Sequence, residues 1–136
     1  MNNATASTNA QLTAFGNLLS SGTLVFYSGF RPATANTALS GNTALATFTF
    51  SATAFNSPTA YSTSQQYMQA SFVTNPVTST TSGTVSFARA YESGGSVAVA
   101  DFSVATANAD IVISNTAISY PGTVTMPSFY IFMANG

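Results

Sequence analysis

The chain has 136 residues, with two arginines, three acidic residues and neither Cys nor His. This length suits one domain with its own hydrophobic core, and the missing residue types exclude disulfides, thiolate metal sites and the commonest general bases. The formal net charge is -1 and Lys is absent, so the chain lacks the cationic surface that nucleic-acid backbones require, and we expect no nucleic-acid partner.

Charged residues make up 4% of the chain, against about 25% in an ordinary soluble domain. A surface with so little charge repels its neighbours weakly and tends to associate. Either partners cover much of this surface, or the protein has a fixed place in a large assembly; a merely hydroxyl-rich exterior is the third explanation. No apolar run approaches the about 20 residues that span a bilayer, and the N-terminus lacks the features of a secretory signal, so we expect no membrane partner.

The polar N-terminus predicts a flexible arm at residues 1–10, followed by a single β-sandwich domain at residues 11–136. The arm either becomes ordered on a neighbouring subunit or is a frayed end. In the first case Asn2, Asn3 and Thr5 are candidate partner-binding residues.

Residues 11–21 predict one short helix, because apolar residues recur there at helical spacing. The apolar stripe consists of Leu12, Phe15, Leu18 and Leu19. Such a stripe usually closes an open end of a β-sandwich, and a docking groove for a partner is the rarer alternative.

The rest of the chain predicts β-strands, because apolar and polar residues alternate with period two between turn-rich spacers. The clearest signal is a hairpin in which residues 84–91 and 96–104 flank a turn that contains a Gly pair. Further strands are predicted at 23–30, 44–51, 67–73, 110–114 and 123–133. We therefore predict an all-β fold: an antiparallel, jellyroll-like β-sandwich of about eight strands with one short N-terminal helix.

The last predicted strand, 123–133, is apolar on both faces. Ile131 and Met133 share one face, and Tyr130 and Phe132 share the other. Such a strand either lies in the middle of a sheet or meets another chain, and we favour the middle of a sheet. In the second case Tyr130 and Phe132 are candidate partner-binding residues.

Few side chains in this sequence can carry chemistry. The acidic residues Glu92, Asp101 and Asp110 are scattered, so they predict neither a carboxylate pair for catalysis nor a cation site. The Gly pair of the hairpin turn lacks the Lys of a phosphate-binding loop. We expect no enzymatic activity, no cofactor and no metal.

The two arginines are the only cations, and each can pair with an acid of this chain or of a partner. Arg89 alternates with Phe87 and Tyr91 along a predicted strand, which favours a packed, structural role. Arg31 lies beside a Pro in a predicted loop and is the better candidate for partner binding.

Three pieces of this sequence resemble virion proteins of tailed double-stranded-DNA bacteriophages. They are Leu-Val-Phe-Tyr-Ser-Gly-Phe-Arg-Pro-Ala at 24–33, Ala-Leu-Ser-Gly-Asn-Thr-Ala-Leu-Ala-Thr at 38–47, and Ala-Phe at 54–55. In those proteins a strand ending in Tyr-Ser/Thr-Gly-x-x-Pro-Ala leads through an Ala-rich loop to a second strand. The chain is most similar to the jellyroll cement, or decoration, proteins of short-tailed phages, and the region 87–95 is similar more weakly.

The resemblance implies a structural protein on the outer capsid surface of a virion, made in the cytoplasm of the host bacterium. Its partners would be the major capsid protein and a second copy in a homodimer, and it would stabilise the head. The alternative function is a tail-fibre or host-attachment module that binds surface glycans through Tyr61, Tyr67 or Tyr91.

Overall fold

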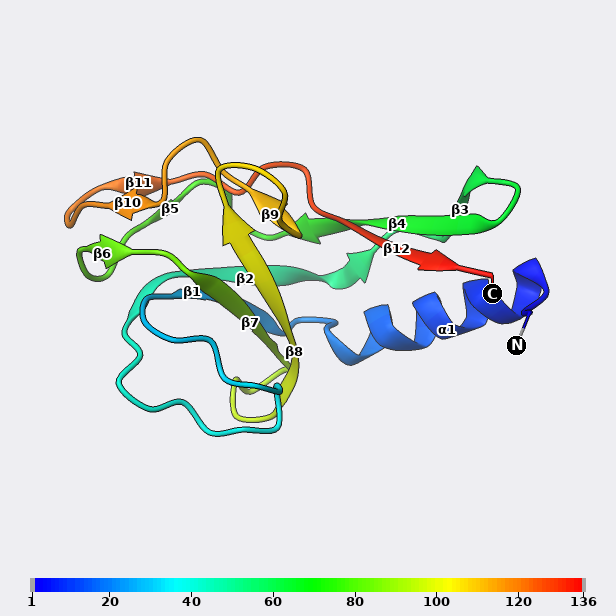
Figure 1. Cartoon of the computed structure of the whole chain (residues 1–136), viewed down its shortest axis with the longest axis horizontal. Coiled ribbons are helices and arrows are strands. Elements are labelled where there is room, and N and C mark those ends of the chain that lie inside the picture. Colours follow the sequence, from blue (N-terminus) through cyan, green and yellow to red (C-terminus); the bar gives the residue numbers. More distant parts are fainter. Residues whose placement is uncertain (1, 136) are drawn as a thin grey trace.

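A computed structural model describes residues 2–135, which form one N-terminal helix and a mostly β fold (Figure 1). The helix α1 spans Thr5–Leu18. The strands are β1 (Thr23–Tyr27), β2 (Ala44–Phe55), β3 (Thr59–Ser62), β4 (Gln65–Phe72), β5 (Val77–Thr78), β6 (Gly83–Thr84), β7 (Phe87–Tyr91), β8 (Ala98–Ala105), β9 (Ile111–Val112), β10 (Ala117–Ile118), β11 (Thr123–Val124) and β12 (Tyr130–Ala134). The prediction of a mostly β chain with one N-terminal helix is confirmed.

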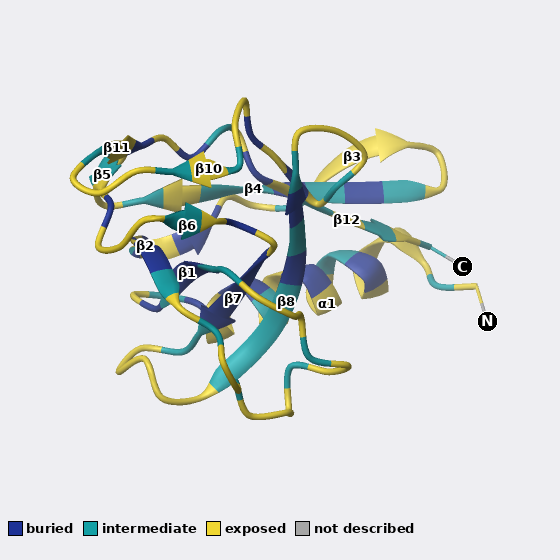
Figure 2. Cartoon of the chain, turned by 60° about the vertical axis from the view of Figure 1, so that its left-hand side comes forward, coloured by how far each residue is buried: buried dark blue, intermediate teal, exposed yellow. Residues whose placement is uncertain are grey.

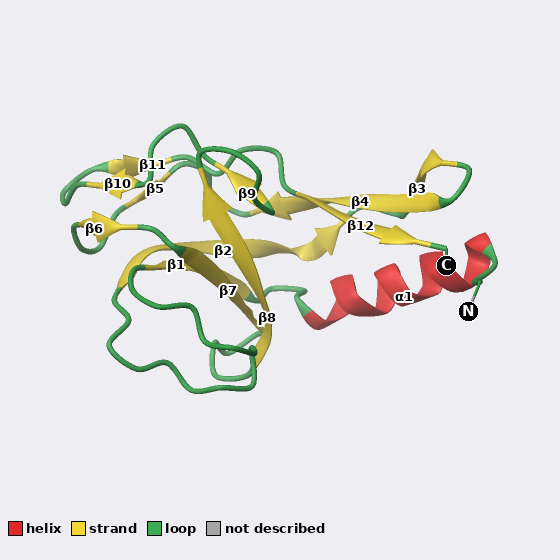
Figure 3. Cartoon of the chain, in the orientation of Figure 1, coloured by secondary structure: helices red, strands yellow, loops and turns green. Residues whose placement is uncertain are grey.

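One sheet of eight strands makes up most of the fold, in the order β12-β4-β2-β1-β7-β8-β9, with β3 also paired to β4. The sheet curls into a half-barrel, and two small ribbons, β6–β10 and β5–β11, lie at the end away from α1 (Figure 3). A jellyroll consists of two large sheets that face each other. This chain has one curled sheet and two small ribbons, so it is not clearly the predicted jellyroll sandwich.

The prediction that all strands are antiparallel was wrong at one pair. β8 and β9 are parallel, with Val104 opposite Ile111. The connection between them folds back because Ser103 and Asp110 bind each other twice: the Ser103 N–H donates to Asp110 Oδ2 (3.0 Å) and the Asp110 N–H donates to Ser103 Oγ (2.9 Å). The chain therefore resumes in the direction of β8 after a short excursion.

The helix begins six residues before its predicted start, so residues 5–10 of the predicted arm are helical. Its buried residues are Thr8, Leu12 and Gly16, while Leu18, predicted to lie on the apolar stripe, is 50% exposed. The contact face combines Leu12 with the small residues Thr8 and Gly16, which allow α1 to pack closely on β2, β4 and β12. A Cβ added to Gly16 would lie 3.3 Å from Phe55 Cδ2.

Aromatic rings fill the concave side of the curled sheet. Phe26 and Phe48 lie with ring centroids 5.3 Å apart, and Phe50 stacks on Phe72 at 4.8 Å. Figure 2 shows buried residues concentrated in β1, β2 and β7 and on one side of α1. The predicted alternation of β2, with Phe48 and Phe50 inward and Thr49 outward, is confirmed.

β12 lies at one end of the main sheet, so the prediction that it lies in the middle of a sheet was wrong. It pairs with β4 alone, from Tyr130 opposite Gln69 to Ala134 opposite Gln65. It is also shorter than predicted, because Thr123 and Val124 belong to a separate ribbon with β5. One edge of β12 is therefore unpaired among the described residues.

The predicted hairpin is confirmed as β7 and β8, and Gly94 and Gly95 have the positive φ values of 99° and 73° that favour glycine. Its outer face is covered by residues 28–43, the β1–β2 loop. The loop is held across β7 and β8 by hydrogen bonds from the Arg89 side chain.

Arg89 forms a nearly fully buried ion pair with Asp101, its direct partner across β7 and β8. Nε donates to Asp101 Oδ1 (2.6 Å) and Nη2 donates to Oδ2 (2.9 Å). Nη1 donates to the Thr37 carbonyl (2.8 Å) and Nη2 also donates to the Thr34 carbonyl (3.3 Å). The hydrogen bond to Asp101 raises the pKa of Arg89, so the guanidinium stays charged. The structural role predicted for Arg89 is confirmed.

We expect Arg89→Ala to lower the free energy of unfolding by about 3–5 kcal/mol, because it leaves the Asp101 carboxylate buried without its cation. Urea unfolding followed by circular dichroism measures the change. Arg31→Ala is the matched control: Arg31 is exposed and makes one long contact, 3.4 Å to the Asp101 carbonyl, so its loss should change stability by about 0.5 kcal/mol or less. Equal stability of the two variants would contradict this role for Arg89.

Candidate functional site

An exposed group of aromatic rings lies on the outer face of β3, β4 and β12; we call Tyr61, Tyr67, Tyr130 and Phe132 the aromatic patch. Ring centroids are 5.0 Å apart for Tyr61 and Phe132, 5.7 Å for Tyr67 and Phe132, and 5.7 Å for Tyr67 and Tyr130. Edge-to-face and offset stacking of this kind contributes about 0.5–1.5 kcal/mol per pair beyond the buried area. The rings therefore support one another as a preformed surface.

Strand register brings these rings together. Phe132 lies opposite Tyr67 across β12 and β4, and Thr59, which shares a face with Tyr61, lies opposite Tyr67 across β3 and β4. Met68, the next residue of β4, points to the other face, where α1 packs. The helix therefore covers one face of these strands and leaves the aromatic face open.

Three rings of the aromatic patch expose a large part of their surface: 64% for Tyr61, 45% for Phe132 and 39% for Tyr130. None of β3, β4 and β12 contains a charged residue. The patch also adjoins the unpaired edge of β12, whose backbone groups can hydrogen-bond to an added strand. Exposed apolar rings beside a free edge form a surface that gains free energy when another molecule covers it.

Two of the predicted partner-binding residues, Tyr130 and Phe132, lie in the aromatic patch. Asn3 lies beside the end of β12, where its N–H donates to the Asn135 carbonyl. Asn2 is exposed and Thr5 is the exposed first residue of α1. None of these three belongs to the patch.

Arg31 lies apart from the patch, in the β1–β2 loop, where it is exposed. Tyr61 and Tyr67, two residues of the alternative glycan-binding function, lie side by side in the patch. The sequence did not join Tyr61 to Tyr130 because residues 55–66 were predicted to be a loop, whereas Thr59–Ser62 form β3. The alternating Thr59 and Tyr61 were the available signal.

Tyr91, the third predicted glycan-binding residue, lies away from the patch under the β1–β2 loop. Its hydroxyl is 2.7 Å from the hydroxyl of Tyr27. Burial raises the pKa of Tyr27 above its ordinary value of 10.0, and the hydrogen bond to Tyr91 raises it further. These two tyrosines form a partly buried contact within the fold, so Tyr61, Tyr67 and Tyr91 do not make one site.

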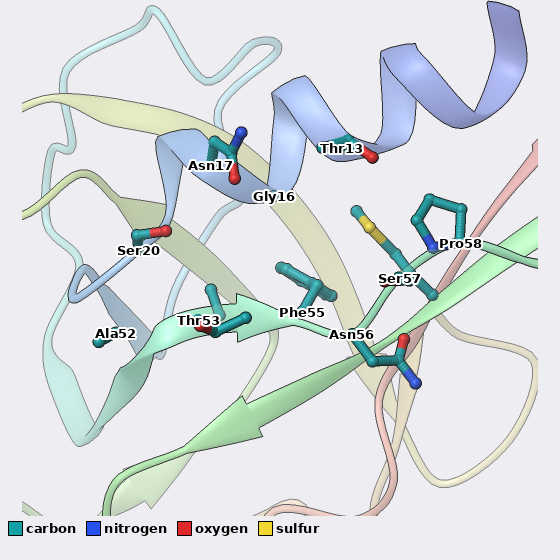
Figure 4. Close-up of a pocket in the computed structure, with 12 residues that line it drawn as sticks. Thr13, Gly16, Asn17, Ser20, Ala52, Thr53, Phe55, Asn56, Ser57 and Pro58 are labelled. Atoms are coloured by element: carbon teal, nitrogen blue, oxygen red, sulfur yellow. The ribbon is translucent and has the colours of Figure 1, made fainter. Parts of the chain in front are cut away.

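Apart from the aromatic patch, a cavity lies between α1 and the end of β2 (Figure 4). This cavity has a volume of about 240 Å³, and Gly16, Phe55 and Met68 line its floor. Hydroxyl and amide side chains surround the opening: Thr13, Asn17, Ser20, Thr53, Asn56 and Ser57. No lining residue is ionisable, so the cavity offers hydrogen bonds and apolar contact, without a general acid or base.

The acidic side chains of the described residues stay separate. Asp101 is paired with Arg89, Asp110 binds the Ser103 backbone, and Glu92 lies at the β7–β8 turn. Within residues 2–135 no group of three or more acidic, Cys or His side chains could hold a metal ion. In the same residues no helix is long and apolar enough to cross a membrane.

Comparisons with known proteins add no assignment: no family model, curated protein or solved structure matches this chain.

We expect stability to fall as the pH rises above 10.0, the ordinary pKa of tyrosine, because folding favours the neutral form of Tyr27. Its contribution is fully present below that pH and is lost as the pH approaches the raised pKa of the folded state. Tyr27→Phe removes the ionisable group, so it should lose less stability than the parent chain between about pH 8 and about pH 11. Urea unfolding at both pH values measures this, and an equal loss in both chains would contradict it.

Proposed function

We propose that this chain is a structural virion protein that cements, or decorates, the outer capsid shell of a tailed phage. It binds major capsid protein subunits and its own copy and stabilises the head. The observation that carries this proposal is the aromatic patch beside an unpaired sheet edge. The sequence resemblance to phage cement proteins supports three further parts of the proposal: the location on the capsid, the jellyroll type and synthesis in the host bacterium.

The patch has the character of a protein-binding surface. Aromatic residues are enriched among the side chains that dominate protein–protein affinity, and charged residues are depleted at the centres of such interfaces. The patch is built on paired strands and its rings contact one another, so little conformational freedom is lost when a partner covers it. An extended segment of a capsid subunit can also add to the free edge of β12.

The low charge of the chain agrees with a fixed place on a capsid shell. Arg89 and Asp101 neutralise each other inside the fold, which leaves Arg31, Glu92 and Asp110 as the other charged side chains. Binding therefore depends on apolar area and backbone hydrogen bonds rather than on ion pairs.

We expect Tyr61→Ala combined with Phe132→Ala to weaken binding to the capsid shell at least tenfold, which corresponds to about 1.4 kcal/mol. The measurement is co-sedimentation of the purified chain with empty shells assembled from the major capsid protein of the same genome. Tyr120→Ala is the matched control, since Tyr120 is 60% exposed but lies outside the patch. The control should bind as the parent chain does.

Salt provides a second readout of the same prediction. Raising the salt from low to molar concentration should leave the chain on the shell, because few charges are present to screen. Release by salt, or unchanged binding by the double variant, would show that the patch does not carry shell binding.

The second candidate is a tail-fibre or host-attachment module that binds surface glycan. The specific observation in its favour is the pairing of exposed Tyr61 with Tyr67, since exposed aromatic faces can pack against the apolar faces of sugars. A glycan array probed with the purified chain tests this. Binding that is lost in Tyr61→Ala and kept in Tyr120→Ala would establish it, and copy number in the particle separates the two functions: hundreds indicate the shell, and a handful indicates the tail.

A further inference from the structure

The most exposed large apolar side chain among the described residues is Phe30, with 93% of its surface in solvent. It lies in the β1–β2 loop and is followed directly by Arg31, which is also exposed. Arg89, the other arginine, is buried in its ion pair, so within residues 2–135 an exposed aromatic ring lies next to an exposed cationic side chain at 30–31 alone.

Hydrogen bonds hold this part of the loop in place. The Asn42 side-chain amide donates to the Ser28 carbonyl (2.9 Å) and to the Phe30 carbonyl (3.0 Å). Gly29 has a φ of 87°, which sets the turn before Phe30, and the Ser86 hydroxyl donates to the Gly29 carbonyl. Phe30 is therefore presented on a fixed backbone, so a partner pays little conformational entropy to bind it.

A matching pocket lies elsewhere on the chain, where the two ends of the curled sheet approach each other. Its volume is about 300 Å³, and its aromatic and aliphatic lining consists of Phe102, Phe129, Tyr130, Ile131 and Phe132. The rings of Phe102 and Phe129 meet edge to face with centroids 5.0 Å apart. A cavity of about 150 Å³ lined by such residues binds benzene, so this pocket has room for one phenyl ring.

An acidic group lies at the same pocket. Asp110 is exposed there, and its Oδ2 accepts a hydrogen bond from the Ser103 N–H (3.0 Å), which fixes the carboxylate. No basic residue lines the pocket. An occupant that fits this pocket combines an apolar ring with an adjacent cation.

We propose that Phe30 of one copy of this chain inserts into the pocket of a second copy, with Arg31 pairing with Asp110. Shape and charge both support this occupant, because the Phe30 ring fits an apolar pocket and the Arg31 cation faces the fixed carboxylate of Asp110. The inference rests on the proposed function in that it names one way in which copies bind each other. The pocket shares Tyr130 and Phe132 with the aromatic patch, while Tyr61 and Tyr67 lie outside its lining.

The contact is small and its affinity in solution is low. One phenylalanine offers about 150–250 Å², whereas a stable interface buries about 800 Å² per partner. Self-association therefore appears at high concentration in solution. On a shell, where neighbouring copies are held close together, the effective concentration is high enough for the same contact to form.

Sedimentation equilibrium of the purified chain from micromolar to millimolar concentration tests the inference without any shell present. We expect the parent chain to self-associate, and Phe30→Ala and Arg31→Glu each to weaken the association about tenfold or more. Arg31→Glu combined with Asp110→Arg reverses the ion pair and should restore most of the affinity. Val73→Ala, at another exposed apolar residue, is the control and should associate as the parent does.

Folding is checked in each variant by its urea midpoint. Because Asp110→Arg also removes the acceptor for Ser103, Asp110→Asn is a second variant that keeps an oxygen there and should still weaken association. A parent chain that stays monomeric, or a Phe30→Ala chain that associates normally, would overturn the inference.

Shell binding of the same variants separates this inference from the proposed function. If Phe30→Ala self-associates as the parent does but no longer binds shells, Phe30 docks on the capsid and the self-contact is wrong. If the patch variants bind shells normally while Phe30→Ala loses self-association, the self-contact stands and the proposed role of the patch fails.

Discussion

The buried pair of Arg89 and Asp101 is the interaction on which the arrangement of this chain depends. Burying two charges is costly unless hydrogen bonds satisfy them, and here all three guanidinium nitrogens and both carboxylate oxygens take part in hydrogen bonds. The guanidinium binds the carboxylate with two nitrogens and reaches two carbonyls of the β1–β2 loop with the same fork. A residue on the central hairpin thereby determines where a long loop without regular structure lies. That loop covers the outer face of β7 and β8 and positions Phe30.

The curl of the main sheet explains why this sheet has two free edges. Because the main sheet bends into a half-barrel instead of facing a second large sheet, both of its ends remain as edges, at β12 and β9. α1 covers one face near β12, and the aromatic patch lies on the other face of the same strands. Edge strands usually carry charges or prolines that discourage pairing. β12 carries neither, which is consistent with a partner covering this region in the assembled state.

Period-two alternation predicted β1, β2, β4 and the β7–β8 hairpin, because strands with one buried face leave that pattern in the sequence. Other features leave no such pattern. The helix start was missed because its contact face uses Thr8 and Gly16, which are not apolar in a periodicity count. Apolar residues on both faces of β12 did not indicate whether the strand lies in the middle of the sheet or at its edge. Which acid pairs with Arg89 depends on the register of the β7–β8 hairpin, and which tyrosines meet Phe132 depends on the register between distant segments.

The shortage of charge connects the two surfaces. A chain with few ionic groups cannot select partners at long range, so selectivity has to come from shape at contact. The aromatic patch supplies apolar area that any flat, uncharged partner could cover. The pocket at Asp110 and the loop at Arg31 place two of the remaining exposed charges beside apolar features of complementary shape. In the assembly that we propose, the apolar patch would hold the chain on its partner, and the ion pair between Arg31 and Asp110 would set the orientation of neighbouring copies.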